Sequence, residues 1–289
     1  MEQATLTGIY IYPIKSCRGI ALDQATVSAI GLDGDRLWQV VDEEGKGLTQ
    51  RQHKILATVS ALPHGDGLRI TADGMAQLDV SRSGGLSARA KSHFGVPVSV
   101  VDAGDDAADW FSSLTDQTVR LVAMAGESGW RLPDPLDIFG QAAPFTDAAP
   151  ILVTSESSLA WLRERSSEDF EMDRFRPNLV ISHAEPWEED SWASFNIGSA
   201  QLRAVLPWPR CAIPQIDQMT ATRHKEPAKV LREHRWCTSA PTVPEQVRPL
   251  VEGNGLFGIG CSINPAGAEL ALGAVVEVSE STTPVLSMA

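Results

Sequence analysis

The chain has 289 residues, of which 43% are hydrophobic and 21% charged, so global disorder is excluded and one large core or two ordinary cores can form. Its formal net charge of −13 argues against nucleic acid or an anionic membrane as the main partner. Two domains are expected from the length, and an anionic ligand would need a local cluster of positive charges.

We expect neither a signal peptide nor a membrane span. The first residues lack a basic stretch followed by an apolar one, and no apolar run is long enough to cross a bilayer. The four cysteines are widely spaced and form no CxxC pair, which argues against a zinc finger, an iron–sulfur cluster and a disulfide framework. A reducing cytoplasm is therefore the expected location.

The first third of the chain predicts short strands separated by glycine-bearing turns. The expected strands are 6–12, 27–30, 37–41, 55–62, 68–71 and 96–101. Asp105 is placed to cap a helix that carries Trp110, Phe111 and Leu114 on one face. Many short strands of this kind favour a barrel or a sandwich.

Two segments of the middle region are interpreted as connections. Residues 128–150 are rich in Pro, Gly and Asp and form either an ordered connecting loop or a mobile flap. Between Trp187 and Trp192, the run Glu188-Glu189-Asp190 predicts an exposed acidic turn whose flanking aromatic side chains pack inward.

A second β-rich unit occupies the rest of the chain. Its expected strands are 151–154, 179–182, 195–206, 256–263 and 274–278. Ser155 can cap a helix over 156–165, and Pro227 suits the start of a helix that ends near His234. We place the domain boundary near 120–130, which gives domains of residues 1–124 and 125–289.

Arg210 and Cys211 are the residue pair best suited to chemistry. They follow Pro207-Trp208-Pro209, whose prolines keep this loop out of a helix. The adjacent arginine favours the thiolate, which is a soft metal ligand or a nucleophile. A buried structural cysteine is the alternative, and we expect that role for Cys237 and Cys261.

Lys15, Ser16 and Arg36 are candidates for binding an anion. Lys15 and Ser16 end the first strand, where an ammonium and a hydroxyl group can contact a phosphate. A solvated turn is the alternative for these two. Arg36 opens the next strong strand, and its alternative role is a salt bridge with Asp33 or Asp35.

Arg176 and Asn178 flank Pro177. Because the residue before a proline is biased toward extended backbone, we expect Arg176 to be extended and to point to the same side as Asn178. A guanidinium and an amide on one face can bind the polar edge of a ligand that offers matching donors and acceptors. A strand-edge pair facing solvent is the alternative.

Four motifs together resemble the MOSC-domain proteins: Tyr12-Pro13-Ile14-Lys15-Ser16-Cys17, Gly34-Asp35-Arg36, Phe175-Arg176-Pro177-Asn178 and Arg210-Cys211. The resemblance extends over about residues 6–278 and points to the two-part group that includes the mitochondrial amidoxime-reducing component and its bacterial relatives. It implies a β-rich α+β fold in which an N-terminal β-barrel-like domain precedes a C-terminal MOSC β-barrel with peripheral helices. A ferredoxin-like domain is expected to be absent.

The resemblance also implies a bound molybdenum cofactor, a molybdopterin, with Cys211 as the protein ligand of the metal. The residues that it implies for holding the cofactor are Lys15, Ser16, Arg36, Arg176, Asn178 and Arg210. Arg51, within Thr49-Gln50-Arg51-Gln52, is expected to line the cleft. Asp217 is either a carboxylate that moves protons near the metal or a turn cap. The family is further associated with pyridoxal phosphate binding.

The activity implied is an oxidoreductase that removes an oxygen atom from small N-hydroxylated compounds or N- and S-oxides. Its electrons would come from a separate ferredoxin, flavodoxin or cytochrome b5-like protein. One alternative is a non-catalytic cofactor or sulfur carrier in molybdenum-cofactor maturation. Another is a hydrolase with Cys211 as nucleophile and His224 or His234 as base.

Two departures from the family pattern leave the substrate open. The chain has Ala148-Ala149 where relatives tend to carry small hydroxyl residues, and Pro209 where they often carry a short polar residue. Both changes remove possible hydrogen bonds to a cofactor or a substrate.

Overall fold

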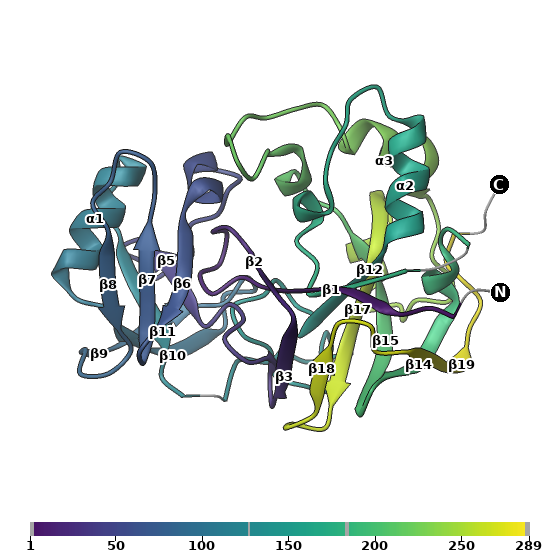
Figure 1. Ribbon diagram of the computed structural model, residues 1–289, viewed down its shortest axis with the longest axis horizontal. Helices are drawn as coiled ribbons and strands as arrows, with labels where there is room; N and C mark the ends of the chain where they lie inside the picture. Colours follow the sequence, from purple (N-terminus) through teal and green to yellow (C-terminus); the bar gives the residue numbers. More distant parts are fainter. Residues whose placement is uncertain (1–2, 127, 183–184, 287–289) are drawn as a thin grey trace.

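The computed structural model describes residues 3–126, 128–182 and 185–286. It is a β-rich α+β fold in which two parts lie side by side (Figure 1). Helix α1 (Asp105–Thr115) lies on the outer side of one part, and α2 (Glu156–Arg165) and α3 (Ala228–His234) cover the other. Among the described helices, none has the length and apolar character needed to span a membrane.

The first part contains two antiparallel sheets. In sheet order, their strands are β5 (Trp38–Val41), β11 (Arg120–Met124), β10 (Pro97–Asp102) and β9 (Ser87–Lys91), and then β6 (Ser60–His64), β7 (Gly67–Thr71) and β8 (Leu78–Ser81). Trp38, Leu56, Ile70, Phe111 and Leu121 form the centre of its core. Apolar side chains of β5, β6, β7, β11 and α1 therefore meet in one cluster, whereas the buried side chains of β9 and β10 belong to a second cluster that is shared with the large sheet.

The second part is built on one large sheet. In order, its strands are β19 (Val276–Ser281), β14 (Trp192–Ile197), β15 (Ala200–Pro209), β17 (Asn254–Asn264), β12 (Ile151–Ser155), β13 (Leu179–Ile181), β1 (Leu6–Ile11) and β2 (Ile20–Leu22), with β16 (Trp236–Cys237) on β17. Strands β12 and β13 are parallel, and the other neighbours are antiparallel.

The start of the chain lies with the second part. Strand β1 pairs with β13, and β3 (Gln24–Ser28) pairs with both β4 (Gly31–Leu32) and β18 (Glu269–Ala271). The chain then crosses to the first part at β5. This crossing puts the segments that carry Lys15 and Arg36 where the two parts meet. The domain boundary between residues 124 and 125 stays a prediction.

The expected β-rich α+β fold is confirmed, but closed barrels are not observed among the described residues. The path of the large sheet runs from β19 to β2 without a ladder between these two ends. A single antiparallel bridge between Thr5 and Val275 links the start of β1 to the residue before β19. The sheet thus curves far enough to bring these segments together without a continuous seam.

Two predicted strands are wrong in their extent. The run 195–206 is two strands, β14 and β15, because Gly198 adopts a φ of 57° and reverses the chain. The run 55–62 begins as the 3₁₀ helix η1 (Lys54–Thr58), and β6 starts only at Ser60. Apolar residues alone do not separate a short helix from a strand.

The helices predicted at α1, α2 and α3 are confirmed. The predicted capping role of Asp105 is wrong, because Gly104 holds the cap position and Asp105 is the first residue of α1. Ser155 directly precedes α2, and Pro227 directly precedes α3, which ends at His234. Within the described ranges, the remaining helices are the four-residue α4 (Arg248–Val251) and three 3₁₀ turns, η2 (Met172–Phe175), η3 (Glu188–Ser191) and η4 (Ile213–Gln215).

The connection that includes residues 128–150 is an ordered loop packed against the core. Trp130, Phe139 and Phe145 are buried in it, and Trp130 bridges Ala143. The Nε1 of Trp130 also donates a hydrogen bond of 2.6 Å to the carbonyl of Pro144. These buried aromatic residues favour the first of the two interpretations of this segment.

The predicted exposed acidic turn is wrong at two of its residues. Trp187 and Trp192 are buried, as expected, but Glu189 is fully buried and the Asp190 side chain is 5% exposed. Asp190 forms an ion pair with Arg235, whose guanidinium lies 3.9 Å from the centre of the Trp187 ring. The buried cation of Arg235, the residue directly after α3, thus draws the acidic turn inward. No local sequence pattern indicates this pairing.

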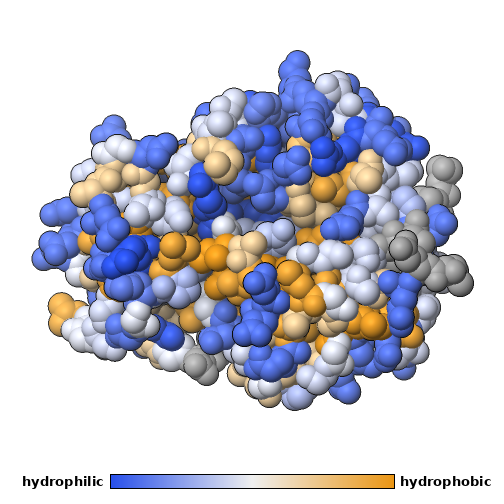
Figure 2. Space-filling view, viewed as in Figure 1, coloured by the Kyte–Doolittle hydropathy of each residue, from blue (hydrophilic) through white to orange (hydrophobic). Residues whose placement is uncertain are grey.

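Figure 2 shows that hydrophilic side chains cover most of this face, including the region between the two parts, while a hydrophobic band crosses the middle of the molecule. The polar surface agrees with the strong net charge of the chain.

Candidate functional site

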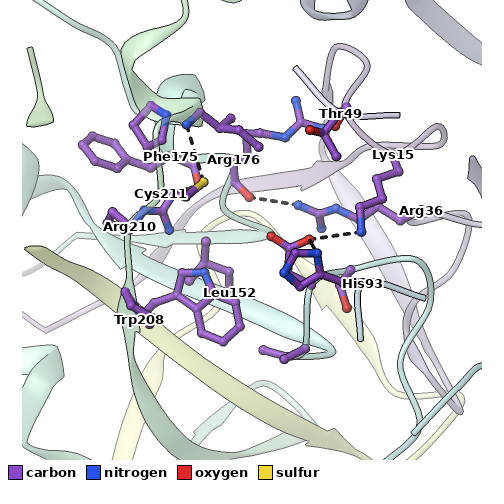
Figure 3. A pocket seen from close by; sticks show the side chains of 18 of the residues that line it. Lys15, Arg36, Thr49, His93, Leu152, Phe175, Arg176, Trp208, Arg210 and Cys211 are labelled. Carbon is purple, nitrogen blue, oxygen red and sulfur yellow. Dashed lines mark hydrogen bonds and ion pairs between the residues drawn. The ribbon is translucent and has the colours of Figure 1, made fainter. Parts of the chain in front are cut away.

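A cavity of about 280 Å³ lies where the two parts of the molecule meet. In Figure 3, Lys15 and His93 lie on one side of it and Arg210 and Cys211 on the other. Eight of the nine residues predicted for the site line this cavity: Lys15, Ser16, Arg36, Arg51, Arg176, Asn178, Arg210 and Cys211. Their convergence from distant segments is observed, whereas their individual roles stay predictions.

Cys211 lies two residues beyond the end of β15. The strand stops at Pro209, and the Arg210 N–H then bonds to the carbonyl of Gly255 at 2.9 Å. Cys211 is a free, exposed thiol, and the Ile213 N–H points to its Sγ at 3.5 Å. The sulfur is therefore accessible from the cavity, and the bond of Arg210 to Gly255 holds the backbone directly before it.

Arg210 brings a buried positive charge beside this sulfur. Its Nη2 donates to the carbonyl of Phe175, while its Nη1 is buried without a hydrogen-bond partner among the described residues. Burial lowers the pKa of Arg210 to about 10, although the nearby Cys211 thiol opposes that shift. The guanidinium thus stays charged at neutral pH and has a free donor.

Arg176 and Asn178 lie on the neighbouring wall. The expectation of extended backbone at Arg176 is wrong, because it ends η2 in the left-handed region, with a φ of 55°. Its N–H bonds to the carbonyl of Asp173 at 3.1 Å, which closes the 3₁₀ turn. Proline at 177 disfavours the right-handed helical region at this position but does not force an extended strand.

The Arg176 guanidinium is also incompletely paired. Its Nη1 donates to Gln218 at 3.1 Å, and its Nη2 is buried without a hydrogen-bond partner in the part of the chain that the structure describes. The pKa of Arg176 is lowered to about 10, mainly by burial; Tyr12 opposes this shift and the nearby Arg36 contributes to it. Like Arg210, this side chain stays charged at neutral pH and retains an unused donor toward the cavity.

Arg36 is held by a buried network around Asp35. Its Nη1 is 2.6 Å from Asp35 and 3.0 Å from the Asn178 Oδ1, and its Nη2 donates to the carbonyl of Arg176. The guanidinium groups of Arg36 and Arg176 each lie 4.2 Å from the Tyr12 ring centre. The salt bridge expected as the alternative for Arg36 therefore exists, with Asp35 as the partner, and it positions this side chain on the cavity wall.

Backbone strain is concentrated at this site. Ser16, Arg36 and Arg176 all have positive φ values, of 66°, 47° and 55°. Residues other than glycine rarely adopt this region, and such strain gathers at functional sites. All three of these residues line the cavity.

Lys15 forms an ion pair with Asp147, a residue that belongs to none of the four sequence motifs. Its Nζ is 3.0 Å from the Asp147 Oδ1, and the His93 Nδ1 is 3.9 Å from the same oxygen. Burial alone would raise the pKa of Asp147, but Lys15 and His93 outweigh burial and hold that pKa well below its usual range. Asp147 is therefore a carboxylate that competes with any anionic ligand for Lys15.

His93 and Asp147 were missed because neither has a local signature. His93 lies in the turn between β9 and β10, where the Gly95 N–H bonds to the carbonyl of Ser92. Asp147 lies in the long connection before β12. Only the tertiary fold brings these two residues to Lys15.

The lining has an excess of positive charge. Five of its side chains are cationic, namely Lys15, Arg36, Arg51, Arg176 and Arg210, and among the described residues Asp147 is the one carboxylate that lines it. This concentration occurs in a chain with a net charge of −13. Together with the two unpartnered guanidinium donors, it indicates a site for an anion.

Asp217 is placed outside the lining. Its Oδ1 accepts hydrogen bonds from the N–H groups of Met219 and Thr220, and its Oδ2 is 3.1 Å from the Arg174 Nη2. This geometry is the turn cap that was one of its two expected roles. A role of Asp217 in proton transfer stays a prediction.

The hydrolase alternative is not supported by the geometry. His224 pairs with Glu168 at 3.2 Å, and the ring of His234 packs edge-on against Trp161. Among the described residues, the histidine that lines the cavity with Cys211 is His93.

Comparison with known proteins places the chain in a family. Family models match the MOSC N-terminal beta barrel domain over residues 3–118 and the MOSC domain over residues 140–277. The chain belongs to the MOSC-domain family. The resemblance predicted from its four motifs is thereby confirmed for this MOSC-domain protein.

Named relatives of this MOSC-domain protein share most of its length. It is 34% identical over 281 residues to mitochondrial amidoxime reducing component 2 of Bos taurus, covering 92% of this chain and 81% of that protein. It is 32% identical to mitochondrial amidoxime-reducing component 1 of Homo sapiens, covering 82% and 73%. It is 29% identical to molybdenum cofactor sulfurase of Danio rerio, covering 81% of this chain but 31% of that protein.

Proposed function

We propose that the protein binds a molybdenum-bearing pterin cofactor in this cavity and is an oxidoreductase that removes oxygen from small N-hydroxylated compounds or N- and S-oxides. One observation carries the proposal. An exposed thiol and five cationic side chains line the same cavity, and two of the buried guanidinium groups have N–H donors that find no partner within residues 3–126, 128–182 and 185–286. The similarity to amidoxime reducing components supports the type of reaction.

The residues present fit such a cofactor. A molybdopterin carries a phosphate, a polar pterin edge and a metal that accepts a thiolate. The cavity offers cationic donors for the phosphate, and an exposed sulfur at Cys211 suits a soft metal ligand. The free donors of Arg176 and Arg210 would otherwise be costly to bury.

Each residue has a part in holding this group. Lys15, Ser16 and Arg36 would bind the anionic portion, and Arg176 with Asn178 would bind the polar edge of the pterin. Cys211 would supply the protein sulfur to the metal, with the charge of Arg210 stabilising the thiolate. When bound, the cofactor supplies a metal centre that takes an oxygen atom from a substrate.

The reaction also sets requirements outside the cavity. Reducing an N-hydroxylated compound to its amine or amidine consumes two electrons and two protons and releases one water. We assign the electrons to a separate ferredoxin, flavodoxin or cytochrome b5-like protein. The cytoplasmic location and the association with pyridoxal phosphate stay predictions.

A second candidate is a non-catalytic carrier of the cofactor or of sulfur in cofactor maturation. The similarity to molybdenum cofactor sulfurase favours it, as do the alanines at 148 and 149, which line the cavity without a hydroxyl group. The same cationic residues would bind the cofactor in either case. Turnover separates the two candidates.

The test is reduction of benzamidoxime by protein purified from cofactor-producing cells, with a reduced viologen dye as electron donor. We expect turnover by the wild type and none by Cys211→Ser. Cys237→Ser is the matched control, because Cys237 is a buried thiol that does not line the cavity, and we expect it to stay active. Bound cofactor without turnover would favour the carrier, and equal activity of Cys211→Ser would refute the proposed site.

A further inference from the structure

The ion pair between Lys15 and Asp147 poses a conflict for any anionic ligand. The ligand needs the Lys15 ammonium, but the Asp147 Oδ1 already lies 3.0 Å from it. A phosphate bound at Lys15 would therefore sit beside a second anion. Two anions at such a distance repel strongly unless one of them gains a new positive partner.

His93 is the group positioned to become that partner. Its Nδ1 is 3.9 Å from the same Asp147 oxygen, so a small side-chain movement makes a hydrogen-bonded pair. The His93 side chain is 38% exposed and also lines the cavity. Its position in the β9–β10 turn leaves it free of the network that fixes Arg36 and Arg176.

The surroundings of His93 disfavour its charged form while no anion is bound. Burial lowers the pKa of His93, Asp147 opposes this shift, and Lys15 and Arg51 lower the pKa further. These three charged groups come from separate loops that all face the imidazole. A dianion between Lys15 and Arg51 would cancel their effect and leave Asp147 to stabilise the imidazolium.

We propose that a dianionic phosphate displaces Asp147 from Lys15, and that Asp147 then pairs with His93, which takes up one proton from solvent as the ligand binds. We call His93 and Asp147 the exchange pair, because Asp147 exchanges Lys15 for His93 as its partner. The anion can then bind Lys15 without an unpaired carboxylate next to it. This inference deepens the proposed function and rests on it only in naming the phosphate of the cofactor as the natural ligand.

The first test uses sulfate as the probe, since it carries two charges and does not titrate near neutral pH. Sulfate binding is followed through tryptophan fluorescence, because Trp208 lines the cavity, with sodium chloride at equal ionic strength as the blank. The uptake of one proton tightens binding as pH falls from 8 to 6, by up to about tenfold for each pH unit. His93→Asn removes this dependence, and Asp147→Asn binds sulfate more tightly than the wild type at pH 8.

A second measurement needs no variant that alters the site. Histidine resonances of the wild type are titrated with and without sulfate, and His93→Asn serves only to assign its signal. His64 is a built-in control because it also faces a carboxylate and a cation, Asp79 and Arg69, on the exposed β6–β8 sheet. Sulfate should move the titration of His93 to higher pH and leave His64 unchanged.

Several outcomes would overturn the inference. Sulfate affinity that is independent of pH, or equal movement of His64 and His93, would show that no linked proton is taken up at this site. Neither experiment requires molybdenum, so such a failure leaves the proposed function standing. Conversely, the absence of molybdenum from purified protein would refute the proposed function without affecting the exchange pair.

The source of the phosphate can also be distinguished. Protein isolated with its cofactor should no longer bind sulfate, and its His93 should already be protonated at pH 7. If the loaded protein still binds sulfate with the same pH dependence, the exchange pair serves a free oxyanion instead of the cofactor.

Discussion

Replacing Asp35 by asparagine should destabilise the wall of the cavity. Asp35 is completely buried, and its oxygens accept hydrogen bonds from the Tyr12 N–H at 2.8 Å, from Arg36 at 2.6 Å and from the Asn178 Nδ2 at 3.0 Å. In Asp35→Asn the remaining side-chain oxygen can still accept the hydrogen bond from the Tyr12 N–H. The new amide group then faces Arg36 and Asn178, which are both donors.

The expected magnitude follows from the loss of one partner of a buried ion pair. Such a loss costs about 3–5 kcal/mol, since the other charge stays buried and uncompensated. At about 2–4 °C for each kcal/mol in a protein near this size, the midpoint of thermal unfolding should fall by roughly 10 °C.

Circular dichroism melts of the wild type, Asp35→Asn and Asp33→Asn measure this effect. Asp33 is the matched control, because it lies two residues away and is exposed. A surface change of this kind is worth less than about 0.5 kcal/mol, so its melt should overlay that of the wild type. Equal midpoints for the two variants would refute the claim that the Asp35 network holds Arg36 in place.

Three further predictions concern other parts of the molecule. Burial and, secondarily, Asp190 raise the pKa of Glu189 to about 8. The folded protein therefore retains a proton that the unfolded chain releases above about pH 4.5, and the free energy of unfolding falls as pH rises between these two values. Urea unfolding should therefore show a smaller loss from pH 5 to pH 9 for Glu189→Gln than for the wild type, and equal losses would contradict this. Iodoacetamide should label Cys211 alone in the folded, cofactor-free protein, since the other three cysteines are buried, and mass spectrometry that finds a second labelled thiol would be inconsistent with the fold. Asp217→Asn, which keeps an oxygen at the turn, should retain turnover within about twofold, whereas a large loss with unchanged melting would restore its predicted role in proton transfer.

The sequence predicted the site better than it predicted the boundaries of the strands. Arg210 and Cys211 can be predicted from the sequence because two prolines fix the preceding backbone and because the pair belongs to a family motif. Lys15 and Arg36 can be predicted because they also belong to family motifs. Their convergence depends on β1 pairing with β13, a contact between residues about 170 positions apart that no local pattern specifies.

Features that arise only from tertiary packing were not predictable. Glu189 looks like a solvated residue in an acidic run, yet the fold buries it beside the ion pair of Asp190 and Arg235. Arg176 looks extended before its proline, yet η2 ends on it in the left-handed region. His93 and Asp147 carry no motif, and their partnership with Lys15 appears only when three loops meet.

The most direct test of the central claim is the metal content of the purified protein. Protein from cofactor-producing cells, analysed by mass spectrometry of its metals and by pterin fluorescence, should contain about one molybdenum and one pterin per chain. Cys211→Ser should lose the metal, while Cys237→Ser should retain it. A wild-type protein that reduces benzamidoxime without molybdenum, or a Cys211→Ser variant that keeps its full metal content, would contradict the account.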